Sequence, residues 1–302
     1  MPRVTVPAAE ALIGHEFPCL NLGHVMLVDY MGGDLSVVQA ARTSYAKDLQ
    51  PFDEEKDSKL IQYLMAHRHT TPFEMVDIKV RMKLPIFVAR QWIRHRTASL
   101  NEESARYSQL KDEFYVPEAS VVKMQSDANK QGRGQEFPVE IQMGFREEFR
   151  REQAGDYADY DRRIQLGMAK ELARINLPVS VYTNWYWKQN LWNMLHLLGL
   201  RMDPHAQYEI RVYANALYEI VKAVAPISLA AWEDHMFKGA RFSRTEMDLL
   251  MQAITKTNNA SAAADLKETV PPVGWLHENL AAKLGKRGAD EFLEKFRKDY
   301  GA

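Results

Sequence analysis

The feature that most constrains the fold of this 302-residue chain is a strictly alternating segment, MVDIKVRMKL, at 75–84. Successive side chains of a β-strand point to opposite faces, so the alternation predicts a half-buried antiparallel strand. Its buried face would carry Val76, Ile78, Val80, Met82 and Leu84. Pro85 follows directly, and because proline suits the first position of a helix, we expect a helix to begin there. A second strand is predicted at 25–30.

Helical patterns account for much of the remaining chain. Asp34 is a residue type that favours helix N-caps, so we expect it to cap a helix that ends near Ser44. The segment 156–177 gathers Ile164, Met168, Leu172 and Ile175 on one helical face, and Pro178 would stop that helix. Further helices are expected at 54–67, 184–201, from Asp203 onward and near 276–299. The helix after Asp203 would bury Ile210, Tyr213, Leu217, Ile220 and Val224.

Two polar stretches, 125–137 and 257–271, are predicted to be loops or linkers. The expected helices outnumber the strands and do not alternate regularly with them, which favours the α+β class. We therefore predict an antiparallel sheet flanked by helices.

The composition argues against a nucleic-acid-binding protein. The formal net charge is -1 and the isoelectric point about 6.8, so the chain lacks a global basic field. No apolar stretch is long enough to span a bilayer. Cys19 is the single cysteine, so we expect neither an internal disulfide nor a Cys-rich metal site. A reducing, cytoplasmic setting without membrane attachment or a signal peptide is the simplest interpretation.

The candidate for chemistry is the stretch QWIRHRTASLNEESARYSQ at 91–109, which we expect to begin at a helix end and to continue as a polar loop. It combines three arginines and a histidine with hydroxyl, amide and carboxyl side chains. The planar fork of arginine matches phosphate or carboxylate, and the other groups offer the donors and acceptors that an imide-containing base requires. A small anionic ligand fits this local cluster better than a long polyanion. The alternative is a solvated charged loop.

Arg94, His95 and Arg96, followed by Ser104, resemble the signature of the flavin-dependent thymidylate synthases. Further blocks resemble the family in order and spacing: AARTSY at 40–45, AHRHTTPFEM at 66–75, ARINLPVSVYT at 173–183, NLWNMLHLLGLR at 190–201 and DPHAQYEIR at 203–211. The resemblance covers about 25 to 235.

The resemblance implies an α+β protomer in a homotetramer whose active sites draw residues from several subunits. The implied reaction converts dUMP to dTMP, with methylenetetrahydrofolate as carbon donor and FAD reduced by NADPH as hydride source. We expect a catalytic domain at 1–240. Residues 241–302, which resemble nothing in the family, would be a mostly helical extension packed on the same domain.

The resemblance also assigns residues by position. For dUMP these are Gln91, Trp92, Ile93, Arg94, Glu102, Glu103, Ser104, Ala105, Arg106, Arg174 and Arg201. For FAD they are Ser44, His69, Thr71, Glu74, Arg94, His95, Arg96, Asn101, Glu102, Asn190, Trp192 and His196. Arg201 is the implied catalytic residue. Trp192 stands where many members have arginine, so a charged contact is lost there. Outside these sets, we expect His205, Gln207 and Glu209 to cap a helix or pack between subunits.

The residues suggest how such a reaction would be activated. A Cys thiolate attacking the uracil ring is improbable, because Cys19 lies outside every block. Ser104 would position the nucleotide, since no base is obviously placed to activate its hydroxyl. Arg201 would stabilise negative charge developing on the uracil imide. The competing interpretations are a non-catalytic nucleotide- or RNA-binding protein and a flavin-dependent RNA uracil methylase. Both RNA readings need a basic groove that this near-neutral chain does not suggest.

Overall fold

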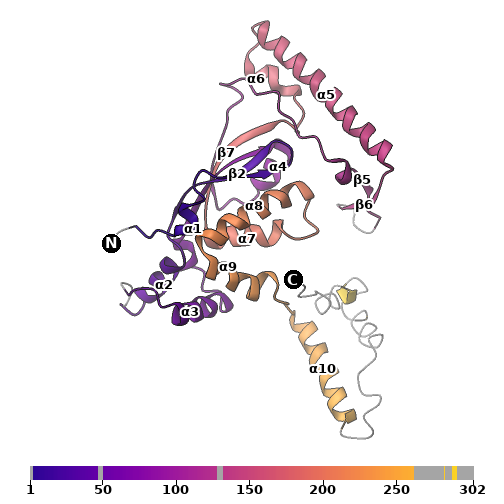
Figure 1. Ribbon diagram of the computed structural model, residues 1–302. Helices are drawn as coiled ribbons and strands as arrows, with labels where there is room; N and C mark the ends of the chain where they lie inside the picture. The colour runs from indigo at the N-terminus through magenta and orange to yellow at the C-terminus, as the bar shows by residue number, and fades with distance from the viewer. Residues whose placement is uncertain (1–2, 47–49, 128–131, 262–281, 283–287, 291–302) are drawn as a thin grey trace. The chain divides into compact units, whose positions relative to one another are not determined.

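The structure, a computed structural model, describes residues 3–46, 50–127, 132–261, 282 and 288–290 (Figure 1). The chain divides into two units, Met1–Trp232 and Glu233–Ala302. Most of the expected helix near 276–299 and most of the expected loop at 257–271 lie outside the described residues. Residues 257–261 are helical, so the loop prediction is wrong for that part. No described helix is both long enough and apolar enough to cross a membrane.

A five-stranded antiparallel sheet organises the first unit, in the order β1-β2-β3-β7-β4. The strands are β1 (Glu16–Cys19), β2 (Gly23–Met31), β3 (Asp77–Pro85), β4 (Ser99–Glu102) and β7 (Tyr182–Asn190). The central β3 confirms the strand predicted from alternation, because all five residues of its apolar face are fully buried. The strand predicted at 25–30 is also confirmed, as β2. The α+β class with an antiparallel sheet and helices is therefore confirmed.

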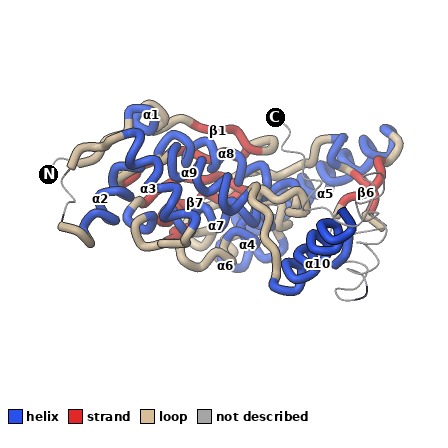
Figure 2. The backbone as a smooth tube through the Cα atoms, turned by 90° about the horizontal axis from the view of Figure 1, so that it is seen from below, coloured by secondary structure: helices blue, strands red, loops and turns tan. Residues whose placement is uncertain are grey.

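The helix α8 (Tyr208–Val224) packs against β1 and β2 and also contacts α1 (Pro7–Glu10), α4 (Ile86–Trp92) and α7 (Leu191–Arg201) (Figure 2). The five residues expected on its apolar face are all buried. Its predicted start at Asp203 is wrong. The Asp203 carboxylate accepts a hydrogen bond from the backbone N–H of His205 at 2.8 Å, in a turn that precedes the helix.

The predicted helix after Asp34 is present as α2 (Asp34–Thr43), but Asp34 is not its cap. Gly33 holds the N-cap position, and the Asp34 carboxylate is directed to α9 (Pro226–Trp232). There it accepts hydrogen bonds from the backbone N–H groups of Ile227 and Ser228, both at 2.9 Å, and from the Ser228 hydroxyl at 2.6 Å. Asp34 thus caps the first turn of α9, a helix remote in sequence. The helix predicted at 54–67 is confirmed as α3 (Glu54–Ala66), which packs against α9.

The helix predicted at 156–177 is wrong at both ends. The observed α5 runs over Val139–Gln165, and the short α6 (Lys170–Ala173) and a 3-10 turn (Arg174–Asn176) follow it. Gly167 ends α5 because its φ of 84° lies in the left-handed region that glycine adopts without strain. Its N–H donates to the carbonyl of Ile164, and that of Met168 donates to Arg163. Met168 therefore does not continue the apolar face, and it stays exposed together with Leu172 and Ile175.

The helix predicted at 184–201 begins seven residues too early, because residues 182–190 form strand β7. β7 pairs with β3 along its whole length, and Trp185, Trp187 and Gln189 alternate inward to buried positions. Asn190 ends the strand and begins α7, since its side-chain oxygen accepts a hydrogen bond from the N–H of Asn193 at 3.0 Å.

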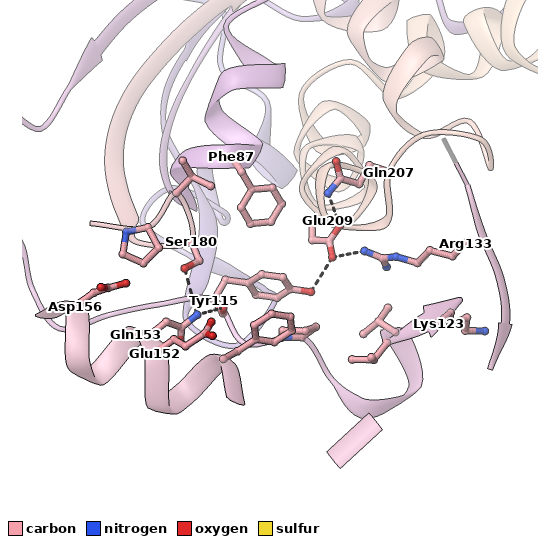
Figure 3. A pocket seen from close by; sticks show the side chains of 16 residues that line it. Phe87, Tyr115, Lys123, Arg133, Glu152, Gln153, Asp156, Ser180, Gln207 and Glu209 are labelled. Atoms are coloured by element: carbon pink, nitrogen blue, oxygen red, sulfur yellow. Dashed lines mark hydrogen bonds and ion pairs between the residues drawn. The ribbon is translucent and has the colours of Figure 1, made fainter. Parts of the chain in front are cut away.

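The polar stretch 125–137 is not wholly a loop. β5 (Lys123–Gln125) pairs with β6 (Arg133–Glu136) in a two-stranded hairpin, stabilised by a 3.0 Å ion pair between Lys123 and Glu136. From β6 the Arg133 side chain reaches the carboxylate of Glu209 at the start of α8 (Figure 3). The hairpin is thereby tied to the helix that covers the sheet.

Short helical turns complete the first unit at Phe73–Met75 and Ala119–Val121. The second unit begins with a π-helical turn, Glu233–Phe237, and continues as α10 (Arg244–Ser261). A capping box starts α10, because the N–H of Ser243 donates to Glu246 at 2.6 Å and the N–H of Glu246 donates to the Ser243 hydroxyl at 3.3 Å.

Candidate functional site

The Arg-rich signature joins the end of α4 to the edge of the sheet. Gln91 and Trp92 close α4, and the buried Trp92 ring meets Trp187 of β7 edge-on, with ring centroids 5.8 Å apart. The polar loop predicted next is partly wrong, since Ser99–Glu102 form β4, which pairs with β7. Pairing with an inner strand gives the signature a fixed backbone.

Two carboxylates at the end of β4 are held by side chains of β7. Glu102 accepts a hydrogen bond from the Thr183 hydroxyl at 2.8 Å, and Glu103 accepts one from the Asn184 amide at 2.7 Å. The backbone N–H of Glu103 also donates to the Asn184 carbonyl at 2.9 Å. The sequence analysis missed Thr183 and Asn184, because only the strand register shows that they face β4.

The segment after β4 lines a cavity of about 460 Å³. This cavity brings together six of the residues expected to bind dUMP, from two separate parts of the chain. They are Glu102, Glu103, Ser104, Ala105, Arg106 and Arg174. Ile86, Leu177 and Val181 add apolar walls, so the cavity combines charge with a hydrophobic lining.

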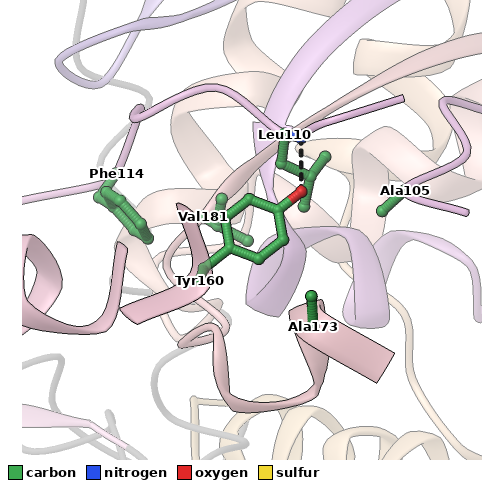
Figure 4. Close-up of a cluster of buried hydrophobic side chains, with 6 residues drawn as sticks. All are labelled: Ala105, Leu110, Phe114, Tyr160, Ala173 and Val181. Carbon is green, nitrogen blue, oxygen red and sulfur yellow. Dashed lines mark hydrogen bonds between the residues drawn. The ribbon is translucent and has the colours of Figure 1, made fainter. Parts of the chain in front are cut away.

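A buried cluster, drawn in Figure 4, shares Ala105, Leu110 and Val181 with the lining of this cavity. It consists of Ala105, Leu110, Phe114, Tyr160, Ala173 and Val181. The Tyr160 hydroxyl of α5 accepts a hydrogen bond from the backbone N–H of Leu110 at 3.0 Å. The end of α5 is thus fastened to the chain that follows β4, and residues 105–110 are held against the protein core.

Arg106 already has a partner in the cavity. Its guanidinium contacts the carboxylate of Glu171 at 3.0 Å, with both side chains about half exposed. Glu171 was missed from the sequence, and its only signal is its position three residues before Arg174 in a helical segment. The Ser104 hydroxyl accepts a hydrogen bond from the Arg106 backbone N–H at 3.3 Å. Within the described residues no histidine hydrogen-bonds that hydroxyl.

Arg201 lies at the end of α7, against the signature. Its Nε donates to Nε2 of His95 at 3.0 Å, and its Nη2 donates to the backbone carbonyl of Gln91 at 3.5 Å. Burial, together with the charge of Arg201 and the nearby His196, lowers the pKa of His95 to about 4. His95 is therefore neutral near pH 7 and can accept the hydrogen bond. The structure places Arg201 with His95 and Gln91, and outside the lining of the 460 Å³ cavity.

Arg94 and Arg96 flank His95, and both arginines are exposed. Neither guanidinium has an ion-pair partner among the residues that the structure describes. Ile93 is likewise half exposed. Exposed guanidinium groups of this kind can bind an anionic group.

The other residues expected at FAD fall into separate places on the protomer. Ser44 lies exposed at the end of α2, and His69 and Thr71 lie exposed between α3 and β3. The His69 ring meets that of Tyr63 edge-on at 5.8 Å. Asn101 is exposed on β4.

Trp192 links two of these places, because its ring lies 6.2 Å from that of Phe73. Phe73 belongs to the 3-10 turn that contains Glu74, and this turn contacts α7, which carries Trp192 and His196. Trp192 therefore packs as an aromatic residue at the position where many members carry arginine.

A second cavity of about 500 Å³ lies between α5, the β5–β6 hairpin and the start of α8 (Figure 3). Phe87, Tyr115, Pro117 and Val179 contribute to an apolar lining, around the buried carboxylate of Glu209. Gln207 holds the N-cap position of α8, but its side chain contacts Glu209 and not the helix N–H groups. Cys19 takes no part in either cavity, and burial raises the pKa of its thiol to about 12.

Comparison with known proteins identifies relatives of this chain. Residues 26–227 match the family model described as thymidylate synthase complementing protein. A Rickettsia conorii protein named flavin-dependent thymidylate synthase is 48% identical over 277 residues, covering 87% of this chain and 94% of that protein. An Anaplasma marginale protein of the same name is 49% identical over 245 residues, covering 81% of this chain and 84% of that protein.

A solved structure is similar as well. It is described as a UMP/dUMP methylase, PolB, from Streptomyces cacaoi, bound with 5-Br dUMP. The TM-score is 0.66 at 32% sequence identity, and the match covers 72% of this chain and 97% of that one.

Proposed function

Because the chain belongs to the family of flavin-dependent thymidylate synthases, we propose that it converts dUMP to dTMP with methylenetetrahydrofolate as carbon donor and NADPH as the source of reducing power. The observation that carries this proposal is the 460 Å³ cavity, whose lining combines Arg106 and Arg174 with two carboxylates that β7 holds in place, Glu102 and Glu103. A nucleoside monophosphate needs both cations for its phosphate and acceptors for its sugar and base.

Arg106 and Arg174 would hold the phosphate, and Glu102 and Glu103 would accept hydrogen bonds from the nucleoside. Thr183 and Asn184 already orient these carboxylates, which lowers the ordering cost of binding. Ser104 would position the nucleotide through its place in the same wall. Gln91, Ile93 and Arg94 would meet the base from the end of α4, and Trp92, whose ring is buried against Trp187, would contribute through its backbone.

Arg201 would stabilise the negative charge that develops on the uracil imide. Its Nε is occupied by neutral His95, so the two terminal nitrogens remain as donors, one of them bonded to the Gln91 carbonyl at 3.5 Å. A guanidinium held in place before the charge develops stabilises it without reorganisation. The pKa of Arg201 is lowered by burial but a guanidinium stays protonated near neutrality.

The side chains fit FAD. Arg94 and Arg96 are exposed cations without ion pairs in the described chain, as an anionic cofactor requires. We propose that these two residues and His95, with Asn101 and Glu102, hold the flavin beside the nucleotide. Ser44, His69, Thr71, Glu74, Asn190, Trp192 and His196 would complete its site. When bound, the reduced flavin supplies the hydride.

We further propose a cytoplasmic homotetramer in which subunits share these sites. The residues proposed for these sites lie in separate places on one protomer, and large apolar side chains are exposed among them. Ile93, Tyr107, Ile175 and Tyr186 are each at least half exposed. We assign the catalytic domain to 1–240 and propose that 241–302 pack on it.

The decisive assay is dUMP-dependent oxidation of NADPH with methylenetetrahydrofolate, with dTMP measured as product. We expect yellow protein with bound flavin, and turnover that stops when dUMP is omitted. UMP belongs in the same assay, because the similar solved structure is described as a UMP/dUMP methylase. Colourless protein that takes up no FAD, or protein that forms no dTMP, would overturn the proposal.

A further inference from the structure

A buried carboxylate outside the proposed nucleotide cavity has three hydrogen-bond donors around it. Glu209 is 2% exposed and lies in the first turn of α8. It accepts from the Tyr115 hydroxyl at 2.9 Å, from Nη2 of Arg133 at 2.5 Å and from Nε2 of Gln207 at 2.8 Å (Figure 3). These donors come from three different parts of the chain, so the carboxylate is held rigidly.

Glu209 remains ionised in this setting. Burial opposes ionisation, but the hydrogen bonds and charge of Arg133 and the amide of Gln207 outweigh it, and the pKa falls below its usual value. An ionised carboxylate only accepts hydrogen bonds. Any amide that contacts Glu209 must therefore present its nitrogen.

This requirement fixes the amide of Gln207, whose two ends differ only in donor and acceptor character. With Nε2 directed at Glu209, its Oε1 is left as an acceptor. Nε2 of Gln91 donates to that oxygen in a short contact. The Gln91 nitrogen is thereby committed to Gln207, and its own Oε1 is the end that remains for a ligand.

Gln91 links the proposed nucleotide contact of its side chain to the proposed catalytic residue Arg201. Its side chain is expected at the nucleotide, and its backbone carbonyl accepts the 3.5 Å hydrogen bond from Arg201. If the Gln91 amide turned by 180°, its Nε2 donor would face the substrate in place of its Oε1 acceptor. The polarity of this residue is set at Glu209, two hydrogen bonds away.

We propose that Glu209 is a positioning residue that acts through Gln207 to present the oxygen of Gln91, as an acceptor, to a donor group of the nucleotide. This inference rests on the proposed function. It assigns a role to the Gln207–Glu209 pair that the expectation of capping or packing does not include. The groups of dUMP that can donate a hydrogen bond to the Gln91 oxygen are the imide N–H and the sugar hydroxyl.

The test is a double-mutant cycle between Glu209→Gln and Gln91→Ala, read as KM and kcat for dUMP and as the Kd of dUMP by calorimetry. In Glu209→Gln the neutral amide no longer dictates which end of Gln207 faces it. We expect KM and Kd to rise about tenfold, the value of one well-made hydrogen bond, with kcat changed far less. In the Gln91→Ala background the same substitution should have no further effect on Kd.

Tyr115→Phe is the matched control. It removes one hydrogen bond to Glu209 but leaves the Gln207 contact, so Kd for dUMP should stay at the wild-type value. Thermal unfolding of each variant identifies a loss of fold. If Glu209→Gln weakens dUMP binding equally with and without Gln91, or does not weaken it, the positioning role is wrong and the proposed function stands. If the wild-type enzyme binds no dUMP, the proposed function itself fails.

Discussion

Arg106 differs from Arg94 and Arg96 in the number of neighbouring groups that contact it within one protomer. Arg106 sits in a walled cavity with a carboxylate partner, beside glutamates fixed by β7. Arg94 and Arg96 are exposed and have no ion-pair partner among the residues that the structure describes. The surroundings of Arg106, where we propose that the nucleotide binds, are thus preorganised within the protomer, whereas those of Arg94 and Arg96, the proposed cofactor residues, are not.

Arg201 provides the largest expected effect, because it would act on the transition state and not on binding alone. Arg201→Met should lower kcat by about 10²–10³-fold, the range for loss of one preorganised donor, with the Kd of dUMP nearly unchanged. Single-turnover flavin oxidation measures the chemical step. Arg150→Met on α5 removes the same charge outside both cavities and should keep full activity. A large rise in the Kd of dUMP with unchanged kcat would assign Arg201 to binding.

Arg174 tests the cavity that Arg106 also lines. Arg174→Met should weaken dUMP binding by about 10–100-fold, the value of a hydrogen bond to a charged group, while kcat at saturating dUMP changes little. Calorimetry with dUMP and with deoxyuridine, which lacks the phosphate, distinguishes an effect on phosphate binding from one on nucleoside binding. Equal losses for both ligands would place Arg174 away from the phosphate. Arg162→Met, an exposed residue on α5, is the matched control.

Arg96 tests the proposed cofactor residues. Arg96→Met should weaken FAD binding by about tenfold and make it less sensitive to salt, because an exposed cation attracts an anion through a screened field. Absorbance of the flavin during titration at two salt concentrations measures this. Unchanged salt dependence would show that Arg96 does not contact the cofactor phosphates.

His95 links stability to pH. Its pKa in the folded protein is about 4, below the ordinary 6.5, so between these values the unfolded chain binds more protons than the folded one. The free energy of unfolding should therefore fall as the pH is lowered from 6.5 to 4. In His95→Gln, which keeps an acceptor for Arg201, this part of the pH dependence should disappear. Denaturant unfolding across that window measures it, and identical profiles would contradict the assignment.

Glu171 should have the smallest effect. Its ion pair with Arg106 is about half exposed, and such pairs contribute little. Glu171→Gln frees Arg106 for the phosphate, so we expect dUMP affinity to rise by a few-fold at most. A fall in affinity would show that Glu171 orients Arg106 and does not compete for it.

The sequence predicted those parts of the fold where one local pattern dominates. The alternation at 75–84 has charged residues on every polar position, and it gave β3 correctly. In β7 the outward positions Asn184, Tyr186 and Lys188 are less distinct, and the helical pattern after Asn190 was extended across them. Gly167 was overlooked as a helix end, because apolar residues beyond it continued the helical spacing.

The candidate site shows the same limit. The signature located residues 102–106 because they are contiguous, and the structure places all five in one cavity wall. Glu171 and Glu209 could not be assigned, since their partners lie 65 and 76 residues away. Such pairings depend on strand order and helix packing, which a local pattern does not contain.

Asp34 begins α2 while its carboxylate closes the first turn of α9, nearly 200 residues later. One side chain thus joins α2 to α9, the last helix of the first unit, and detaching α9 would leave both its first N–H groups and the Asp34 carboxylate without these partners. A truncation that removes α2 should therefore loosen the helix that leads out of the unit, where residues 233–302 begin. The start of α9 therefore depends on a residue of α2.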